Sequence, residues 1–361
     1  MSQRVFNFCA GPCTLPLEAL EEAQAEFVDF KGAGMSLIEM SHRAKEYDAV
    51  HQEALALLRE VFGAPAEFEP LLIQGGATLQ FAMIPLNLLT PGAKAGYVMS
   101  GSWAKKAFAD AKPCGEVYEA WSGADEKFTR MPASDEIKVE PGTRYLHITS
   151  NETIGGIRFS AWPEVSVPLV ADMSSEYFSR PIPWEKFDLV YGGAQKNLGP
   201  AGLAVVFICK SIVEGLNPNL SAYLRYGPHV DNQSLYNTPP MFSIWIMGKV
   251  LKWIKANGGL SAMEAAAEEK SALLYNVVEG SGGFYNSPVK ASDRSQMNVV
   301  FTLSSDKLTA KFLAESNAAG LKNLKGHRSV GGCRASIYNA MPKAGVEALA
   351  KFMQEFQAAN G

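Results

Sequence analysis

The stretch FDLVYGGAQKNLGPAGLAVVFIC, residues 187–209, combines two apolar runs with a single charged residue between them. The runs LVY and GLAVVFIC are almost continuously apolar, as in strands that helices cover on both faces. The turn that joins them holds Lys196, the one charged side chain between Asp188 and Lys210, although charged residues make up 19% of the chain. This pattern predicts two buried strands and a poorly hydrated lysine in the turn between them.

The same alternation of short strands and amphipathic segments extends to about residue 257. Further strands are expected in PLLIQ, AGYVM, RYLHIT and VPLVA, and helices in ATLQFAMIPLNLL, SWAKKAFADAK and MFSIWIMGKVLKWIKA. Ser102 is the predicted N-cap of the second of these helices, and Gly258 and Gly259 are expected to end the third. The succession predicts an α/β fold with a mainly parallel sheet covered by helices.

The sequence changes in character after residue 258. An Ala/Glu-rich helix is followed by the predicted strand SQMNVVFTL and by two further helices around CRASIYNA. We therefore predict a large domain over residues 16–258. A smaller α+β domain is expected over residues 259–361, together with the N-terminal segment 1–15.

The composition of the 361-residue chain excludes several classes of protein. The hydrophobic fraction is 47% and the net charge is −4, without the basic excess of a general nucleic-acid or anionic-membrane binder. No apolar run approaches the roughly 18 residues of a membrane span, and the N-terminus does not resemble a signal peptide. Five scattered cysteines form no Cys-x-x-Cys pair. We expect a cytoplasmic protein with reduced cysteines, no metal site, and no nucleic-acid or membrane partner.

Candidate binding residues follow several of the predicted strands. Ligands of open parallel sheets lie beyond the carboxyl ends of the strands. The turn at Gly76 opens a helix N-terminus that favours an anion, and Trp103 offers a flat aromatic surface. Thr153 is a hydrogen-bonding group, and Asp172 is a carboxylate at the end of an apolar strand, which is costly unless it is paired. Each one alone also fits a tight turn, core packing, a loop cap or an ion pair.

Lys196 gives these residues a common chemistry. Loss of hydration lowers the pKa of a lysine and makes its amine nucleophilic, so that it forms Schiff bases with aldehydes such as pyridoxal phosphate. That cofactor requires a lysine, a carboxylate at its ring nitrogen, an aromatic face, a hydrogen bond to its phenolic oxygen and an anion site for its phosphate. The sequence supplies each in kind: Lys196, Asp172, Trp103, Thr153 and the Gly76–Ala77 turn.

Two of the five histidines directly precede an arginine. The pairs are His42–Arg43 and His327–Arg328, and Arg334 follows closely in GGCRASIYNA. Paired histidine and arginine suit a dianion such as phosphate, whereas a single arginine binds a carboxylate in a bidentate manner. Any one of these arginines alone fits a surface ion pair.

The chain resembles the phosphoserine aminotransferase family, class V members of the fold-type I pyridoxal-phosphate enzymes. The resemblance covers essentially the whole chain and lies in nine segments, in order: NFCAGPCTLP, MSHRAKEY, LLIQGGATLQF, SGSWAKKA, SNETIGGI, ADMSSEYFSRPI, GGAQKNLGPAGL, YNTPP and GHRSVGGCRASIYNA. It implies a homodimer with shared active sites. Gly155 departs from the family pattern, because this position often carries a larger side chain.

The resemblance also implies roles for the cofactor-binding residues. Lys196 resembles the Schiff-base lysine and Asp172 the partner of the ring nitrogen. Trp103 would stack on the ring, and Thr153 would bond its phenolic oxygen. The cofactor phosphate would be bound by the following residues, the last two reaching the site of the neighbouring subunit: Gly76, Ala77, Gln195, Asn237 and Thr238.

The implied substrate residues are the basic ones. Arg334 resembles the arginine that holds the substrate α-carboxylate. His42, Arg43, His327 and Arg328 match the cluster that faces the phosphate of phosphoserine or the distal carboxylate of glutamate. Which subunit supplies each of the four stays open.

The activity that the resemblance implies is ping-pong amino transfer from L-glutamate to 3-phosphohydroxypyruvate, giving O-phospho-L-serine and 2-oxoglutarate, as in serine biosynthesis. Family members also act on 4-phosphohydroxy-L-threonine in pyridoxine biosynthesis. Other class V chemistries remain as alternatives: an aminotransferase for a non-phosphorylated amino acid, a cysteine desulfurase or another lyase. A non-catalytic anion- or nucleotide-binding protein is the alternative from another class.

Overall fold

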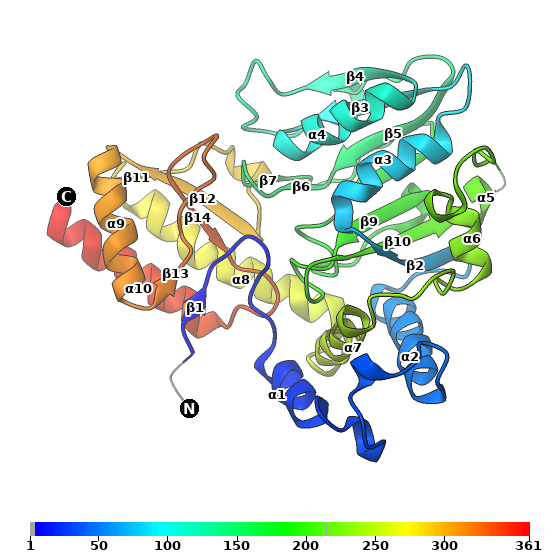
Figure 1. Cartoon of the computed structure of the whole chain (residues 1–361). Helices are drawn as coiled ribbons and strands as arrows, with labels where there is room; N and C mark the ends of the chain where they lie inside the picture. Colours follow the sequence, from blue (N-terminus) through cyan, green and yellow to red (C-terminus); the bar gives the residue numbers. More distant parts are fainter. Residues whose placement is uncertain (1–3, 214) are drawn as a thin grey trace.

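The computed structural model describes residues 4–213 and 215–361, and its centre is a seven-stranded sheet (Figure 1). The strand order is β2-β10-β9-β8-β5-β3-β4. In that order the strands are Phe68–Gln74, Leu203–Cys209, Leu189–Gly193, Leu169–Asp172, Thr143–Thr149, Lys94–Met99 and Glu116–Ser122. β10 is antiparallel to both of its neighbours, and the other pairs are parallel. The mainly parallel α/β sheet predicted from the sequence is confirmed.

Helices cover both faces of this sheet, which explains why its strands are almost continuously apolar. Leu71 and Ile73 of β2 pack with α3 (Gly76–Leu88) and α4 (Ser102–Ala111). Leu72 faces the other way and packs with α2 (Lys45–Phe62) and α7 (Met241–Ala256). Side chains alternate between the two faces of a strand. A strand that is covered on both faces therefore has apolar side chains at nearly every position.

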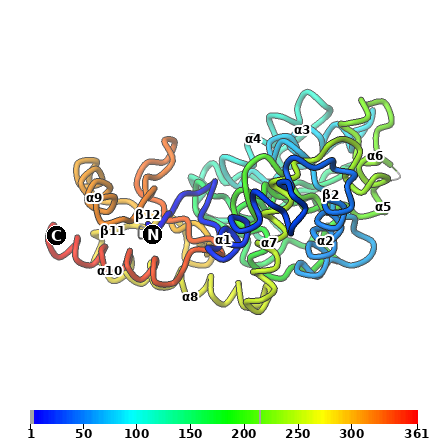
Figure 2. Tube along the Cα trace, turned by 60° about the horizontal axis from the view of Figure 1, so that its bottom comes forward, coloured from blue at the N-terminus to red at the C-terminus, as the bar shows by residue number. Residues whose placement is uncertain are grey.

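The C-terminal residues form a second layered unit with its own core (Figure 2). Its helices are α8 (Gly259–Gly280), α9 (Asp306–Ala318) and α10 (Lys343–Asn360), around the three-stranded sheet of β11 (Tyr285–Asn286), β12 (Asn298–Leu303) and β14 (Cys333–Ser336). The N-terminal strand β1 (Phe6–Asn7) pairs with β13 (Leu321–Lys322), and Phe8 lies in this core. The domain boundaries drawn from the sequence stay a prediction.

Several further elements complete the fold. They are α1 (Leu17–Glu26), α5 (Lys210–Val213), α6 (Tyr226–Asp231) and the hairpin of β6 (Asn151–Glu152) and β7 (Ile157–Arg158). Within the described residues, no helix has both the length and the apolar character needed to cross a membrane.

The predicted N-cap of α4 is wrong. Ser102 is the first helical residue, and Gly101 occupies the N-cap position. The glycine has no side chain for capping, and a carboxylate from elsewhere in the chain accepts the first helical N–H groups instead, from Trp103 and Ala104. The predicted end of α7 is confirmed: the helix ends at Ala256, and Gly258, at φ +92°, follows its C-cap residue Asn257.

Candidate active site

A cavity of about 310 Å³ lies at the carboxyl edge of the large sheet. β8 ends at Asp172 and β9 just before Lys196, so the two residues meet at this edge. The cavity is bounded by the N-terminal segment at Gly11 and by residues of the C-terminal unit. Nine of the predicted site residues line it: Gly76, Ala77, Trp103, Thr153, Asp172, Gln195, Lys196, His327 and Arg334.

Lys196 is only 7% exposed and its amine faces this cavity. Nζ donates a hydrogen bond to Oγ1 of Thr153 at 2.6 Å and lies 5.3 Å from the centroid of the Trp103 ring. Burial lowers the pKa of Lys196 to about 8, although the nearby Asp172 carboxylate opposes the shift. About a tenth of the amine is therefore uncharged at pH 7, far more than for an ordinary lysine, as a nucleophile or base requires.

Asp172 is buried at the same edge. Its Oδ1 accepts the backbone N–H of Ser174 at 2.9 Å and the Ser174 hydroxyl at 2.6 Å. Burial raises the pKa of Asp172, while the Ser174 bonds and the charge of Lys196 oppose the rise. Among the described residues no group hydrogen-bonds Oδ2, so this oxygen can accept a bond from a ligand in the cavity.

The turn after β2 opens a helix N-terminus towards the cavity. Gly75 and Gly76 have φ of +97° and +67°, in the left-handed region that favours glycine. A Cβ on Gly76 would meet no atom within 4 Å, so the turn leaves open space beside the first N–H groups of α3. Such N–H groups and the helix dipole attract an anion.

Positive side chains from the C-terminal unit complete the cavity. Arg334 donates from Nη1 to the carbonyl oxygen of Thr153 at 3.2 Å, and it has no carboxylate within 4.0 Å among the described residues. Nδ1 of His327 accepts the backbone N–H of Ser329 at 3.3 Å, which leaves Nε2 as the N–H donor. Arg328 is exposed and does not line the cavity.

The remaining predicted residues lie outside the cavity of their own chain. Thr238 contacts His42 (Oγ1 to Nδ1, 3.3 Å) and accepts a hydrogen bond from Gln74 on its carbonyl oxygen at 2.8 Å. Arg43 and Asn237 are neighbours of this pair in sequence, and neither lines the cavity. The predicted site residues therefore form two separate groups. One group lines the cavity, and the other lies outside it, around the contact between Thr238 and His42.

Three residues near the cavity were not among the predicted site residues. Ser174 orients Asp172, Glu152 contacts the first turn of α4, and Asn197 accepts the backbone N–H of Asn339 at 3.0 Å. Ser174 could have been found from its position two residues after Asp172. The other two act across long sequence separations, for which a single sequence contains no local signal. Among the described residues no group of His, Cys, Asp and Glu is placed to hold a metal ion.

The sheet topology and the buried lysine at its carboxyl edge define the class of protein: the chain belongs to the aminotransferase class-V family, whose model matches residues 5–349. The fold and family predicted from the sequence are confirmed, and membership of an enzyme family weighs against a non-catalytic binding protein.

Several relatives that match over nearly the full chain at 38–50% identity are phosphoserine aminotransferases. The chain is 49% identical over 358 residues to that of Bacillus subtilis, with 99% of each chain covered. The solved structure of the enzyme from Bacillus circulans subsp. alkalophilus matches with a TM-score of 0.98 at 50% identity over 100% of both chains. The pyridoxal-phosphate-bound enzyme from Trichomonas vaginalis matches with a TM-score of 0.93 at 38% identity, over 97% of this chain and 100% of that one.

Proposed function

We propose that the chain is a pyridoxal-phosphate-dependent phosphoserine aminotransferase. It transfers the amino group of L-glutamate to 3-phosphohydroxypyruvate and releases 2-oxoglutarate and O-phospho-L-serine. The observation that carries the proposal is the cavity itself, where a buried, partly uncharged lysine faces an arginine without a carboxylate partner. The full-length relatives at about half identity support the same substrates.

The residues of the cavity fit pyridoxal phosphate. When bound, the cofactor supplies an aldehyde for the lysine amine and a protonated ring that withdraws electrons from the substrate. Oδ2 of Asp172 is available for the ring N–H, and the face of Trp103 lies beside the lysine amine. Thr153 supplies a hydroxyl for the phenolic oxygen. The N-terminus of α3, at Gly76 and Ala77, and the side chain of Gln195 suit the phosphate.

Lys196 performs the proton transfer. With a pKa of about 8, its amine can take the proton from the substrate Cα at neutral pH and would deliver it to the aldehyde carbon of the cofactor, C4′, without a large energetic penalty. Thr153, at 2.6 Å, holds the amine in the cavity. Because glutamate leaves as a keto acid before the second substrate binds, the kinetics are ping-pong.

The basic residues select the substrates. Arg334 binds the α-carboxylate of either amino acid in a bidentate manner. His327, which lines the cavity, faces the distal anionic group, which is a phosphate in phosphoserine and a carboxylate in glutamate. The next residue, Arg328, is exposed outside the cavity and adds a second positive charge beside it. A neutral side chain would leave these cations unpaired, which argues for phosphoserine over cysteine or alanine.

We further propose a homodimer with shared active sites. His42, Arg43, Asn237 and Thr238 lie outside the cavity of their own chain, where a second copy could use them. The large unit also carries exposed apolar side chains: the ring centroids of Phe27 and Phe242 lie 6.2 Å apart and each residue is 41% exposed, and Val28 is 80% exposed. Burying such side chains against a second copy stabilises a dimer. A cytoplasmic location and the 4-phosphohydroxy-L-threonine reaction stay predictions.

Steady-state assays with different amino donors test the substrate. We expect efficient amino transfer from phosphoserine and glutamate, and a loss of about two orders of magnitude or more in kcat/KM for serine, alanine and cysteine. Sulfide release from cysteine at a rate above phosphoserine turnover would identify a desulfurase instead.

Mixed dimers test the shared site. Lys196→Ala and Arg43→Ala subunits are each expected to be poorly active alone. In a hybrid dimer, the intact Lys196 of one subunit meets the partner subunit's Arg43, so random mixing restores about one quarter of wild-type activity. If Arg43 served its own chain, mixing would restore nothing.

A further inference from the structure

Glu152 is a buried carboxylate that the proposed chemistry leaves without a role. It lies in β6, its side chain is 0% exposed, and it directly precedes Thr153. Its oxygens accept the first helical N–H groups of α4, Oε2 from Trp103 at 3.1 Å and Oε1 from Ala104 at 2.9 Å. A fully buried carboxylate is costly, and two N–H bonds at a helix N-terminus offset part of that cost.

The start of α4 leaves room for this carboxylate. Gly101 is the N-cap, and a Cβ there would lie 2.6 Å from Cδ of Glu152 and 2.8 Å from Oε2. Any larger residue would therefore displace the carboxylate. Ser102, the capping residue that the sequence suggested, is exposed, and its side chain makes no capping bond. The capping function at this helix belongs to a residue 49 positions away.

Two residues of the cavity depend on where Glu152 lies. Trp103 carries the ring beside Lys196, and its Nε1 is buried without a partner among the described residues. No hydrogen bond of the indole itself fixes the ring, so its position depends on packing against the core of α3 and α4 and on the backbone that Glu152 holds. Thr153, the next residue in the chain, bonds the Lys196 amine.

We propose that Glu152 is a positioning residue for the cofactor site: it anchors the Trp103 backbone so that the indole lies beside Lys196. The inference rests on the proposed function, since it concerns the same cofactor. Glu152 itself does not line the cavity, so it acts through Trp103 rather than by touching cofactor or substrate. The charged groups that face it across the site are Asp172 and Lys196.

The test measures cofactor affinity rather than turnover. Cofactor-free protein is titrated with pyridoxal phosphate, and the dissociation constant is read from the absorbance of the bound form. Glu152→Gln keeps the size of the side chain but loses its charge and turns an N–H donor towards the helix. We expect the dissociation constant to rise roughly tenfold. Ser102→Ala, at the same helix start, is the matched control and leaves the constant unchanged.

A double-mutant cycle separates positioning from general loss of stability. In a Trp103→Ala background the anchored ring is absent, so Glu152→Gln should change the dissociation constant by less than about twofold. An equal effect in both backgrounds, or none in either, overturns the proposal. Far-ultraviolet circular dichroism checks folding, and Glu152→Asp, which keeps the charge on a shorter stem, replaces the glutamine variant if that one does not fold.

The outcomes also separate this inference from the proposed function. If wild-type protein takes up no pyridoxal phosphate, the proposed function fails and the inference fails with it. If wild-type protein binds normally and the glutamine variant binds equally well, only the inference fails. In turnover, a positioning role predicts a lower kcat with an unchanged KM for glutamate, because Glu152 makes no contact with the substrate.

Discussion

The ionisable groups at the cavity and those around Arg130 are in opposite environments: burial favours the neutral forms of the first, and ion pairing favours the charged forms of the second. At the cavity and directly behind Trp103, burial shifts the pKa of each ionisable group so that its neutral form is favoured. It lowers the pKa of Lys196 to about 8, raises that of Glu152 to about 7 and raises that of Asp172. Lys196 and Glu152 therefore stay close to a proton exchange near neutral pH, because water no longer stabilises their charged forms.

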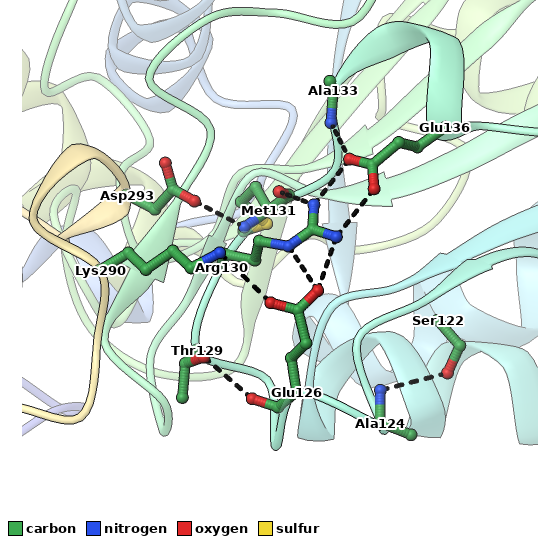
Figure 3. A network of polar contacts seen from close by, with 10 residues as sticks. All are labelled: Ser122, Ala124, Glu126, Thr129, Arg130, Met131, Ala133, Glu136, Lys290 and Asp293. Carbon is green, nitrogen blue, oxygen red and sulfur yellow. Dashed lines mark hydrogen bonds and ion pairs between the residues drawn. The ribbon is translucent and has the colours of Figure 1, made fainter.

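The Arg130 network does the reverse (Figure 3). The guanidinium lies 2.6 Å from carboxylate oxygens of both Glu126 and Glu136, near the protein surface. The hydrogen bonds that Arg130 donates to the two carboxylates lower the pKa of Glu136 to about 2 and raise the pKa of Arg130 itself. Pairing thus keeps these side chains charged. The network also joins the loop after β4, which contains Arg130 and Met131, to the C-terminal unit, because the N–H of Met131 donates to Asp293 at 2.9 Å.

The comparison shows that burial without a matched partner produces reactive groups, whereas close pairing produces unreactive ones. A second buried lysine refines this rule. Burial also lowers the pKa of Lys270 to about 8, but its ammonium donates to the carbonyl oxygens of Tyr338, Asn339 and Met341. Lys270 therefore has no hydrogen directed at a ligand cavity, and we expect a structural role.

The largest effect is expected for Lys196→Ala. Without the amine, turnover should fall by more than about a thousandfold, because both the nucleophile and the base are lost. The near-ultraviolet or visible band of the bound cofactor should disappear in an absorbance scan. Lys270→Met is the matched control, since it removes an equally buried lysine and should keep the band. A Lys196→Ala variant that cycles glutamate at the normal rate would contradict the assignment.

Asp172→Asn should come next in size. The amide has the shape of the carboxylate but cannot hold a protonated ring nitrogen through charge, so we expect kcat to fall about a hundredfold or more. The fold should persist, because asparagine Oδ1 can still accept the two Ser174 bonds. Circular dichroism checks that the variant is folded, and a steady-state assay measures its kcat. Full activity in the variant would show that the Asp172 carboxylate is not needed for the reaction.

Lys270→Met should affect stability rather than catalysis. Three carbonyl oxygens lose their donor, which costs about 2 kcal/mol in the free energy of unfolding. The sign of the pH dependence follows from the lowered pKa. The folded state disfavours the charged amine, so the cost of burying it is greatest below pH 8 and is relieved as the pH rises from about 8 towards 10.5. Denaturant unfolding should show that the free energy of unfolding of the wild type is higher at pH 10 than at pH 7, and that the variant lacks this increase.

Arg130→Met should have the smallest effect. Ion pairs near the surface contribute little, so the thermal midpoint at pH 7 should fall by no more than a few degrees. The pKa of Glu136 lies below its ordinary value of 4.5, so its contribution is present above that pH and is lost as the pH falls towards 2. Melting curves of wild type and variant should therefore converge in acid. If the difference in thermal midpoint between wild type and variant grew as the pH fell, the ion pair between Arg130 and Glu136 would not be the cause.

The sequence alone determined the parts of this protein that local chemistry encodes. Continuous apolar runs require strands covered on both faces, and the isolation of Lys196 between two such runs predicted a dry amine. Asp172 and Trp103 could be placed beside it because parallel strands bring their carboxyl ends to one edge.

Only the tertiary structure decided which distant groups meet. The helix at Ser102 carries a capping residue of the correct type, yet the cap comes from Glu152, because β5 lies between β3 and β8 and brings the residues that follow it against α4. Likewise Thr238 meets His42 across 196 positions. Periodicity and turn residues report on neighbours in the chain, whereas such contacts depend on strand order and on the space that a residue like Gly101 leaves open.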